Sequence, residues 1–314
     1  GLNIVAHGLC AVAHLYSGEI VKATEFGEAG LALLNPEFNR SIARKSGLAP
    51  EVNICCYLNQ AWWELGFPDV AREYAERAIR VARETEHKPS EEFAVGHQTQ
   101  SFHMDRNPEG VLEAAENARA IAGKRRSPFW GPVTETYSGW AMCVLGSSAE
   151  GIELMRRGVK EFVISGHGLS QVCMRVALAE GLGMSGAYDE ALSVIDETVR
   201  ISEETGEVLH IAEAYRLRGD CLRNIAATLS GSAREECLLE AESALLEALR
   251  CARAQTARSL ELRAAISHFQ LRTDCGDMTG RSEALAATVS SFPDDLRSPE
   301  MIDARALLAG ASSH

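Results

Sequence analysis

Short turns interrupt the helical pattern of this 314-residue chain at nearly regular intervals. The breaks lie at or near Gly18, Gly66, Arg106, Gly146, Gly186 and Gly276. The three steps between 66 and 186 are each 40 residues, and the step from 186 to 276 leaves room for two units of 45. A period of this length, built from paired helices, is typical of an α-solenoid. The spacing therefore predicts an all-α fold of about seven helical hairpins without β-sheet.

Small residues recur where the paired helices of a unit are expected to touch. The second helices carry them at three- and four-residue spacing, as in Ala71, Ala75 and Ala78. The first helices carry Gly139 and Gly219 at the corresponding level. Small side chains let two helix axes approach closely, so we expect these positions to be helix contacts.

Two segments depart from the regular pattern. The third unit has polar residues in SEEFAVGHQTQSFHMDR (90–106), where an apolar first helix is expected. In the sixth unit, IAATLSGSAREE (225–236) reads as a loop that delays the second helix. A long link with an extra helical turn is expected over residues 34–51.

The segment AYDEALSVIDETV (187–199), preceded by LAEGLGMSG, resembles a tetratricopeptide repeat. Longer stretches, LGFPDVAREYAERAIRVARE, AEAYRLRGDCL and the tail MIDARALL, resemble the tetratricopeptide C-terminal regions of bacterial multidomain regulators. Those proteins join a class III adenylate or guanylate cyclase, or a DNA-binding module, to a signal-transduction ATPase. The resemblance implies one right-handed superhelical domain over residues 1–314, cut from a longer protein, with no chemistry of its own.

Composition narrows the partners and the compartment. A formal net charge of −13 argues against nucleic acid or an anionic membrane as the main partner. Nine cysteines without a C-x-x-C pair fit a reducing cytoplasm. No stretch reaches the roughly 18 apolar residues of a membrane span.

Motifs for catalysis or cofactor binding do not emerge from the sequence. GLGMSG (181–186) matches a dinucleotide fingerprint, but it lacks the preceding strand that such a site needs. His97 and His103 are six residues apart and so face directions about 120° apart on one helix. We expect no cofactor, no metal site and no catalytic residue.

In a tetratricopeptide superhelix the first helices line the concave surface, and a fixed set of their positions points inward. The resemblance carries that inward set to Asn53, Tyr57, Gln60, Trp63, Glu64, His97, Gln100, His103, Tyr137, Trp140, Glu180, Glu213, Arg216, Asp220, Arg223, Asn224 and Arg263. The irregular turn leaves the register of the third unit open by one residue. Aromatics, amides and both signs of charge together suit a ligand of mixed character.

The leading hypothesis is a regulatory or sensor module that binds a protein, peptide or small molecule in this concave groove. One alternative is a structural scaffold that forms a homo-oligomer through its outer helices. Another is an enzyme that uses His97 or His103 with Glu64 or Glu180 for acid–base work.

The inward set also predicts two walls across one concave surface. Trp63, Tyr137 and Trp140 would form an aromatic wall, and Arg216, Arg223 and Arg263 an arginine wall. An elongated ligand with an anionic end would fit between them, because arginine presents paired donors to carboxylate or phosphate. The competing hypothesis is that the arginines neutralise neighbouring carboxylates such as Glu213 and Asp220.

Overall fold

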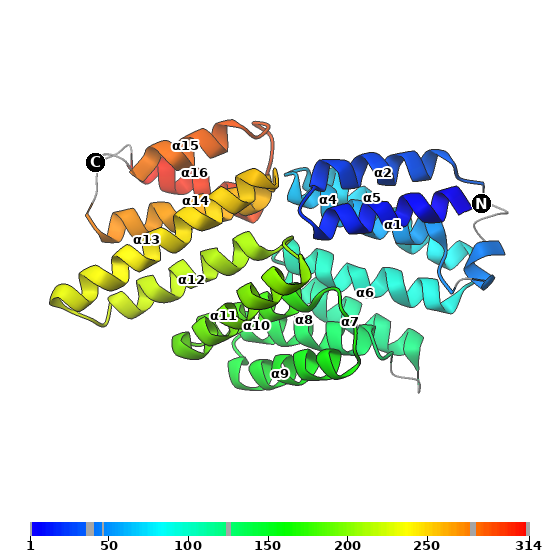
Figure 1. Cartoon of the computed structure of the whole chain (residues 1–314), viewed down its shortest axis with the longest axis horizontal. Coiled ribbons are helices and arrows are strands. Elements are labelled where there is room, and N and C mark those ends of the chain that lie inside the picture. The colour runs from blue at the N-terminus through cyan, green and yellow to red at the C-terminus, as the bar shows by residue number, and fades with distance from the viewer. Residues whose placement is uncertain (1, 36–40, 46, 124–126, 277–280, 312–314) are drawn as a thin grey trace.

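The computed structural model describes residues 2–35, 41–45, 47–123, 127–276 and 281–311. These residues contain helices and turns and no β-strand, which confirms the predicted all-α solenoid (Figure 1). Its hairpins are α1 (Leu2–Tyr16) with α2 (Ile20–Ala32), α4 (Pro50–Glu64) with α5 (Pro68–Glu84), α6 (Lys88–Met104) with α7 (Pro108–Ala122), α8 (Trp130–Val144) with α9 (Ser148–Ile164), α10 (Gln171–Met184) with α11 (Tyr188–Thr205), α12 (Ile211–Ala226) with α13 (Gly231–Ala254), and α14 (Arg258–Asp274) with α15 (Arg281–Ser290). A further helix, α16 (Pro299–Ala311), follows the last hairpin.

The hairpin turns lie where the sequence predicts them. Gly18, Gly66, Gly146 and Gly186 have φ between 77° and 94°, a left-handed conformation that glycine adopts without a steric penalty. Arg106 occupies the same place in the third hairpin, with φ of 56°. An arginine therefore adopts a backbone conformation that is costly for it at this one turn.

Helix α13 corrects one prediction. It begins at Gly231, so residues 227–230 alone lie outside the helices in a stretch expected to be a loop over 225–236. Residues 231–236 are mostly exposed and polar, so they lack the apolar periodicity that reveals a helix. The alanine, arginine and glutamate residues of this stretch nevertheless favour helix, so α13 begins more than one turn earlier than expected. The extra helical turn in the second link is present at residues 41–45, while 36–40 and 46 lie outside the described residues.

The predicted small-residue contacts are tight. A Cβ atom on Gly139 of α8 would lie 2.4 Å from the carbonyl oxygen of Gly151 on α9. A Cβ on Gly219 of α12 would lie 2.5 Å from the Leu245 side chain of α13. Glycine is needed at both places because the paired helices leave no room for a methyl group.

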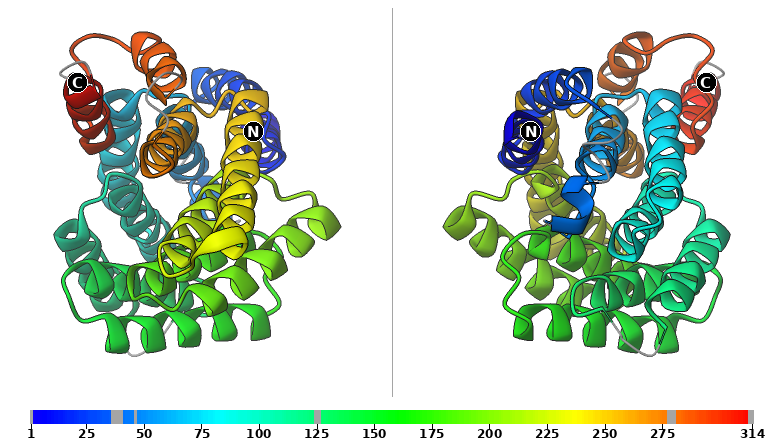
Figure 2. Two further views of the ribbon diagram at one scale, coloured as in Figure 1. Left: turned by 90° about the vertical axis from the view of Figure 1, so that its left-hand side faces the viewer. Right: turned by 90° about the vertical axis from the view of Figure 1, so that its right-hand side faces the viewer.

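Successive first helices pack side by side, and the array then returns to its start. Helices α4, α6, α8, α10, α12 and α14 each contact the next, and α14 also contacts α4. Seen along the long axis, the helices surround the centre, with the α1–α2 hairpin and the α15–α16 pair along the same edge (Figure 2). The superhelix therefore closes after about one turn.

Several hydrogen bonds join units that are far apart in the sequence, and we call the following three the closure contacts. Val208 N donates to the carbonyl oxygen of Tyr16 (2.8 Å). Ser259 Oγ donates to the carbonyl oxygen of Trp63 (2.6 Å), and Arg263 Nη2 donates to that of Met104 (2.7 Å). The first hairpin is thus held against the link between α11 and α12, and the second and third hairpins are held against α14.

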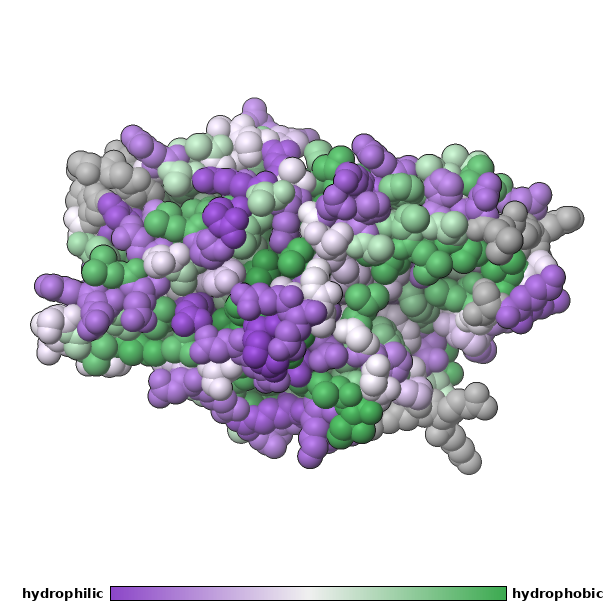
Figure 3. All heavy atoms as spheres, in the orientation of Figure 1, coloured by the Kyte–Doolittle hydropathy of each residue, from purple (hydrophilic) through white to green (hydrophobic). Residues whose placement is uncertain are grey.

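The first hairpin is less covered than the middle of the array. On the face drawn in Figure 3, hydrophobic residues gather over the region of α1. Leu9 on α1 is 64% exposed and Val21 on α2 is 46% exposed. Within this chain the hairpin packs against α4.

Candidate functional site

The inward set lies inside the closed superhelix, and most of it is buried. Asn53, Tyr57, His103, Asp220, Arg223 and Asn224 are half-buried, and the other members are buried. The concave surface is therefore filled at these residues, because the second half of the chain covers the inner face of the first half. Whether the set binds a ligand stays a prediction.

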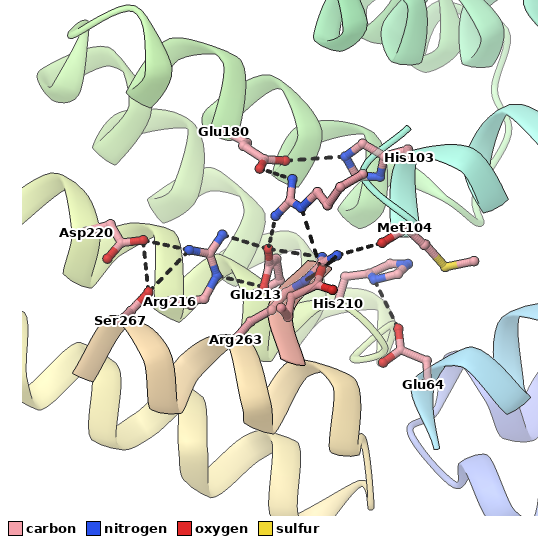
Figure 4. A network of polar contacts seen from close by, with 12 residues as sticks. Glu64, His103, Met104, Glu180, His210, Glu213, Arg216, Asp220, Arg263 and Ser267 are labelled. Carbon is pink, nitrogen blue, oxygen red and sulfur yellow. Dashed lines mark hydrogen bonds and ion pairs between the residues drawn. The ribbon is translucent and has the colours of Figure 1, made fainter. Parts of the chain in front are cut away.

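At the centre of this interior lies a cluster of charges that we call the charge network (Figure 4). Its members are Arg106, Glu180, Glu213, Arg216, Asp220, Arg263 and Glu300. They come from the α6–α7 turn and from α10, α12, α14 and α16. The network therefore joins the third unit to the fifth, sixth and seventh, and to the helix that follows them.

Arg106 is the hub of the charge network. Its Nη1 donates to Glu180, its Nη2 lies 3.6 Å from Glu213 Oε1, and its Nε lies 4.0 Å from Glu300 Oε1. The left-handed backbone at Arg106 directs the side chain toward these three carboxylates. His103, one helical turn earlier, donates to the second oxygen of Glu180 (3.3 Å).

Arg216 is fully engaged within its own helix and with α14. Its Nε and Nη2 donate to the two oxygens of Glu213 at 2.9 and 2.8 Å. Its Nη1 donates to Asp220 Oδ2 (2.6 Å), which also accepts from Ser267 Oγ (3.1 Å). Paired, charge-assisted bonds of this kind compensate for the removal of the charges from water.

Arg263 contacts both the first turn of α16 and the first half of the chain. Its Nε and Nη2 both donate to Glu300 Oε1, at 2.9 and 2.6 Å. Its guanidinium lies over the ring of Trp63, 4.8 Å from the centroid. Trp63 Nε1 in turn donates to Asp105 (3.1 Å).

Arginines hold the carboxylates of Glu180, Glu213 and Glu300 in their charged form. Burial opposes ionisation of Glu213, but Arg216 and Arg263 outweigh it and lower its pKa to about 2. Burial also opposes ionisation of Glu180 and Glu300, yet Arg106 lowers the pKa of the first and Arg263 that of the second. These directions support the hypothesis that the arginines neutralise neighbouring carboxylates.

Glu64 lies outside the charge network, and its environment differs from that of these carboxylates. It is 0% exposed, and neither carboxylate oxygen has a hydrogen-bond partner. His210 Nδ1 lies 3.7 Å from Glu64 Oε1, and the Gln60 side-chain amide donates to His210 Nε2 (3.1 Å). Burial raises the pKa of Glu64 to about 8 and lowers that of His210 to about 4. Both side chains are therefore neutral near pH 7.

The aromatic residues pack against histidines. His97 contacts Tyr57, Phe93 and Trp130, and burial lowers its pKa to about 3. His103 contacts Tyr137 and Trp140. Gln100 donates to Cys173 Sγ (3.7 Å). The two expected walls meet at one point, where Arg263 stacks on Trp63. Arg106, which was not part of the expected arginine wall, lies 5.9 Å from the ring centroid of Trp140.

The remaining inward residues lie away from this centre. Arg223 donates to Gln270 (2.7 Å), and Asn224 donates to the Asp220 carbonyl oxygen (2.7 Å). Asn53 faces Gly8 of α1. These three are held within or between neighbouring units, so they do not take part in the charge network.

Three important residues escaped the sequence analysis. Arg106 stands in a turn, His210 at the end of a loop, and Glu300 on the helix after the last hairpin. None of them occupies an inward position of a first helix within the seven hairpins. For Arg106 a signal did exist, because it replaces the glycine found in the equivalent turns.

No group of three or more His, Cys, Asp or Glu side chains within the described part of the chain is arranged to hold a metal ion. Over the same residues, every helix is too short or too polar to cross a membrane.

No family model matches the chain, and no curated protein matches it. Among solved structures, the chain is similar to a signal transduction ATPase with numerous domains from Pyrococcus horikoshii, which has a tetratricopeptide repeat sensor. The two are 16% identical with a TM-score of 0.46, and the match covers 92% of this chain and 42% of that one. It is also similar to PilW, a type IV pilus biogenesis factor, at 13% identity and a TM-score of 0.42, over 80% of this chain and 96% of that one. RapI in its apo form is similar at 11% identity and a TM-score of 0.48, over 99% of this chain and 86% of that one. The chain thus spans less than half the length of the first of these proteins.

Proposed function

We propose that this chain is a regulatory module that binds a protein, peptide or small molecule on the inner face of its superhelix. It carries out no chemistry itself and passes its bound or unbound state to other domains of a bacterial cytoplasmic regulator. The observation that carries the proposal is the closure of the superhelix over its own inward polar residues. Ligand binding and closure would then compete for one surface.

Closure can be lost without loss of the helical repeats. Each hairpin of a solenoid is stabilised mainly by its immediate neighbours. The closure contacts instead link Tyr16 to Val208, Trp63 to Ser259 and Met104 to Arg263. Opening the superhelix breaks these bonds and also separates buried apolar side chains that the two halves share, such as Leu15, Trp63 and Leu209, while the neighbour contacts stay in place. Closed and open forms of one folded chain would then be two states that a ligand can shift.

The geometry gives less support to an acid–base enzyme. His103 and Glu180 do form a pair at 3.3 Å, as that alternative requires. Glu180 is also bound to Arg106, and His103 is packed against Tyr137 and Trp140. A carboxylate held in its charged form by arginine is a weak base, so this pair is poorly suited to moving protons.

Site-specific photo-crosslinking in the native cell tests the proposal. A photoreactive amino acid at half-buried Arg223, on the inner face of α12, should capture a specific partner or ligand when the superhelix opens. The matched position is Glu153 on the outside of α9, whose side chain is 72% exposed. Cross-links between copies of the chain from position 153, with none from position 223, would instead favour the assembly scaffold.

A further inference from the structure

We infer that Glu300 is an internal ligand that occupies a carboxylate-binding site formed by Arg263 and Arg106. A ligand carboxylate would bind there by replacing it. This inference rests on the proposed function and names the ligand chemistry and the autoinhibitory contact at the same surface.

The site has the geometry of carboxylate recognition. Two nitrogens of Arg263 converge on Glu300 Oε1 at 2.9 and 2.6 Å, and Arg106 Nε lies 4.0 Å from the same oxygen. Trp63 covers one face of the Arg263 guanidinium, and the Met104 carbonyl oxygen fixes one of its nitrogens. The guanidinium is therefore oriented by groups other than Glu300, as in a preorganised site.

The donor groups of Arg263 explain why a carboxylate would be recruited to this site. The charge network holds four carboxylates, those of Glu180, Glu213, Asp220 and Glu300, against the three guanidiniums of Arg106, Arg216 and Arg263. Without Glu300 the two numbers become equal, and Arg263 Nη1 keeps Glu213 Oε1 at 3.6 Å. Arg263 still loses the acceptor to which its Nε and Nη2 both donate. Buried N–H donors that lose their acceptor are unfavourable, so a second carboxylate should be drawn into the vacated position.

Glu300 is the member of the network that can leave. Glu180 and Glu213 are built into α10 and α12 in the middle of the array, where helices pack on both sides. Glu300 lies in the first turn of α16, which contacts α14 and α15. Its side chain is 14% exposed, against 6% for Glu213. Movement of α16 would therefore empty the site without disrupting the hairpins.

A small cavity lies beside the same carboxylate. Its volume is about 20 Å³, and its lining includes Trp63, Gly66, Phe292, Ser298 and Glu300. It is bounded by the α4–α5 turn on one side and by the segment between α15 and α16 on the other. The cavity marks the boundary at which α16 and this segment would separate from the first half of the chain.

Chemical rescue of Glu300→Ala in the purified full chain tests the site directly. The variant should melt at a lower temperature than the wild type. Propionate should raise its melting temperature in a saturable way, by roughly 2 °C or more at a concentration about tenfold above its Kd. Propionamide, which has the same shape without the charge, should not. Asp303→Ala removes an exposed carboxylate from the same helix and should show no response to propionate.

A second variant covers the case in which Glu300→Ala does not fold. Glu300→Gln keeps the side-chain shape and weakens the internal contact. It should bind a fluorescein-labelled hexaglutamate peptide at least about tenfold more tightly than the wild type does. A hexaglutamine peptide should show no such gain, and adding Arg263→Gln should remove it.

The two arms separate the sources of the carboxylate. Rescue by propionate without peptide binding identifies a small carboxylic acid as the ligand, and gain of peptide binding identifies an acidic protein segment. Failure of both, in variants that are folded by circular dichroism, overturns the inference. Both arms use the purified chain alone, so they can succeed even if crosslinking at position 223 finds no partner and the proposed function fails.

Discussion

At the scale of single residues, Arg106 combines an unfavourable backbone with favourable ion pairs. Its φ of 56° costs roughly 1 kcal/mol relative to glycine. Its side chain contacts Glu180, Glu213 and Glu300, and breaking buried pairs costs about 3–5 kcal/mol, less here because the side chain is 24% exposed.

Arg106→Gly should therefore lower the free energy of unfolding by roughly 1–3 kcal/mol in urea titrations, although it relieves the backbone. Glu86 is the matched control, because it is exposed and also has a positive φ, of 50°. Glu86→Gly should change the stability little. A glycine at 106 that left the protein as stable as the wild type would mean that the charge network contributes nothing to the fold.

The buried pair of Glu64 and His210 predicts that the free energy of unfolding is largest at intermediate pH. The pKa of Glu64 is raised from 4.5 to about 8, so its stabilising contribution is lost as the pH rises through 8. The pKa of His210 is lowered from 6.5 to about 4, so its contribution is lost as the pH falls through 4.

Glu64→Gln isolates the alkaline limb, because glutamine cannot ionise. Between pH of about 6 and about 9, the melting temperature should fall more steeply for the wild type than for the variant. Glu207, whose pKa burial raises to about 7, titrates in both proteins and cancels in the difference. Parallel melting curves for the two proteins over this range would show that Glu64 is already ionised at neutral pH.

At the scale of helices, a single methyl group distinguishes a contact glycine from an ordinary one. Gly139→Ala would place Cβ 2.4 Å from a backbone oxygen of α9, which cannot move as a side chain can. We expect a loss of about 1–3 kcal/mol in chemical denaturation. Gly183 in α10 is the matched control, because the nearest atom to its Cβ would be Cys221 Sγ at 3.6 Å. Gly183→Ala should instead stabilise by roughly 0.5–1 kcal/mol, and equal effects at both sites would contradict the contact.

Helices and turns were predictable from the sequence to the extent that local chemistry specifies them. The turns at Gly66, Gly146 and Gly186 each require one residue with a left-handed backbone conformation, and a single glycine in the sequence reveals each of them. The start of α13 was missed because its exposed first turns carry no apolar pattern. The third unit was recognised as irregular, yet α6 forms because buried His97 and Gln100 find aromatic and sulfur partners that only the folded chain supplies.

At the scale of the whole molecule, closure can be weakened without unfolding the repeats. Arg263→Gln with Tyr16→Phe would cut one closure contact, that of Arg263 with Met104, and also the side-chain hydrogen bond between Tyr16 and Ser170. The radius of gyration from small-angle scattering should rise, while the helical circular dichroism stays unchanged. Arg156→Gln on the outer face is the control and should leave both unchanged. Loss of helix together with expansion would show that closure and folding are one transition.

Closure was not predictable, although most of the residues that it buries were. The tetratricopeptide resemblance specifies which side of a first helix faces inward, and it placed Trp140 and Arg216 there. The contacts that cover this face join residues 159 and 196 positions apart, and no local pattern encodes them. With Trp140 at 1% and Arg216 at 8% exposure, alanine at either position should lower the melting temperature, contrary to the expectation for groove residues open to solvent.

The return of α14 to α4 has a consequence for how such a chain can evolve. An open array can gain or lose a hairpin anywhere, because each new unit needs only two compatible neighbours. Here an added or deleted hairpin between the third and the seventh would carry Arg263 and Ser259 away from Met104 and Trp63. The number of repeats between these two units is therefore fixed by geometry, and length variation is tolerated only in loops and beyond the segments that meet.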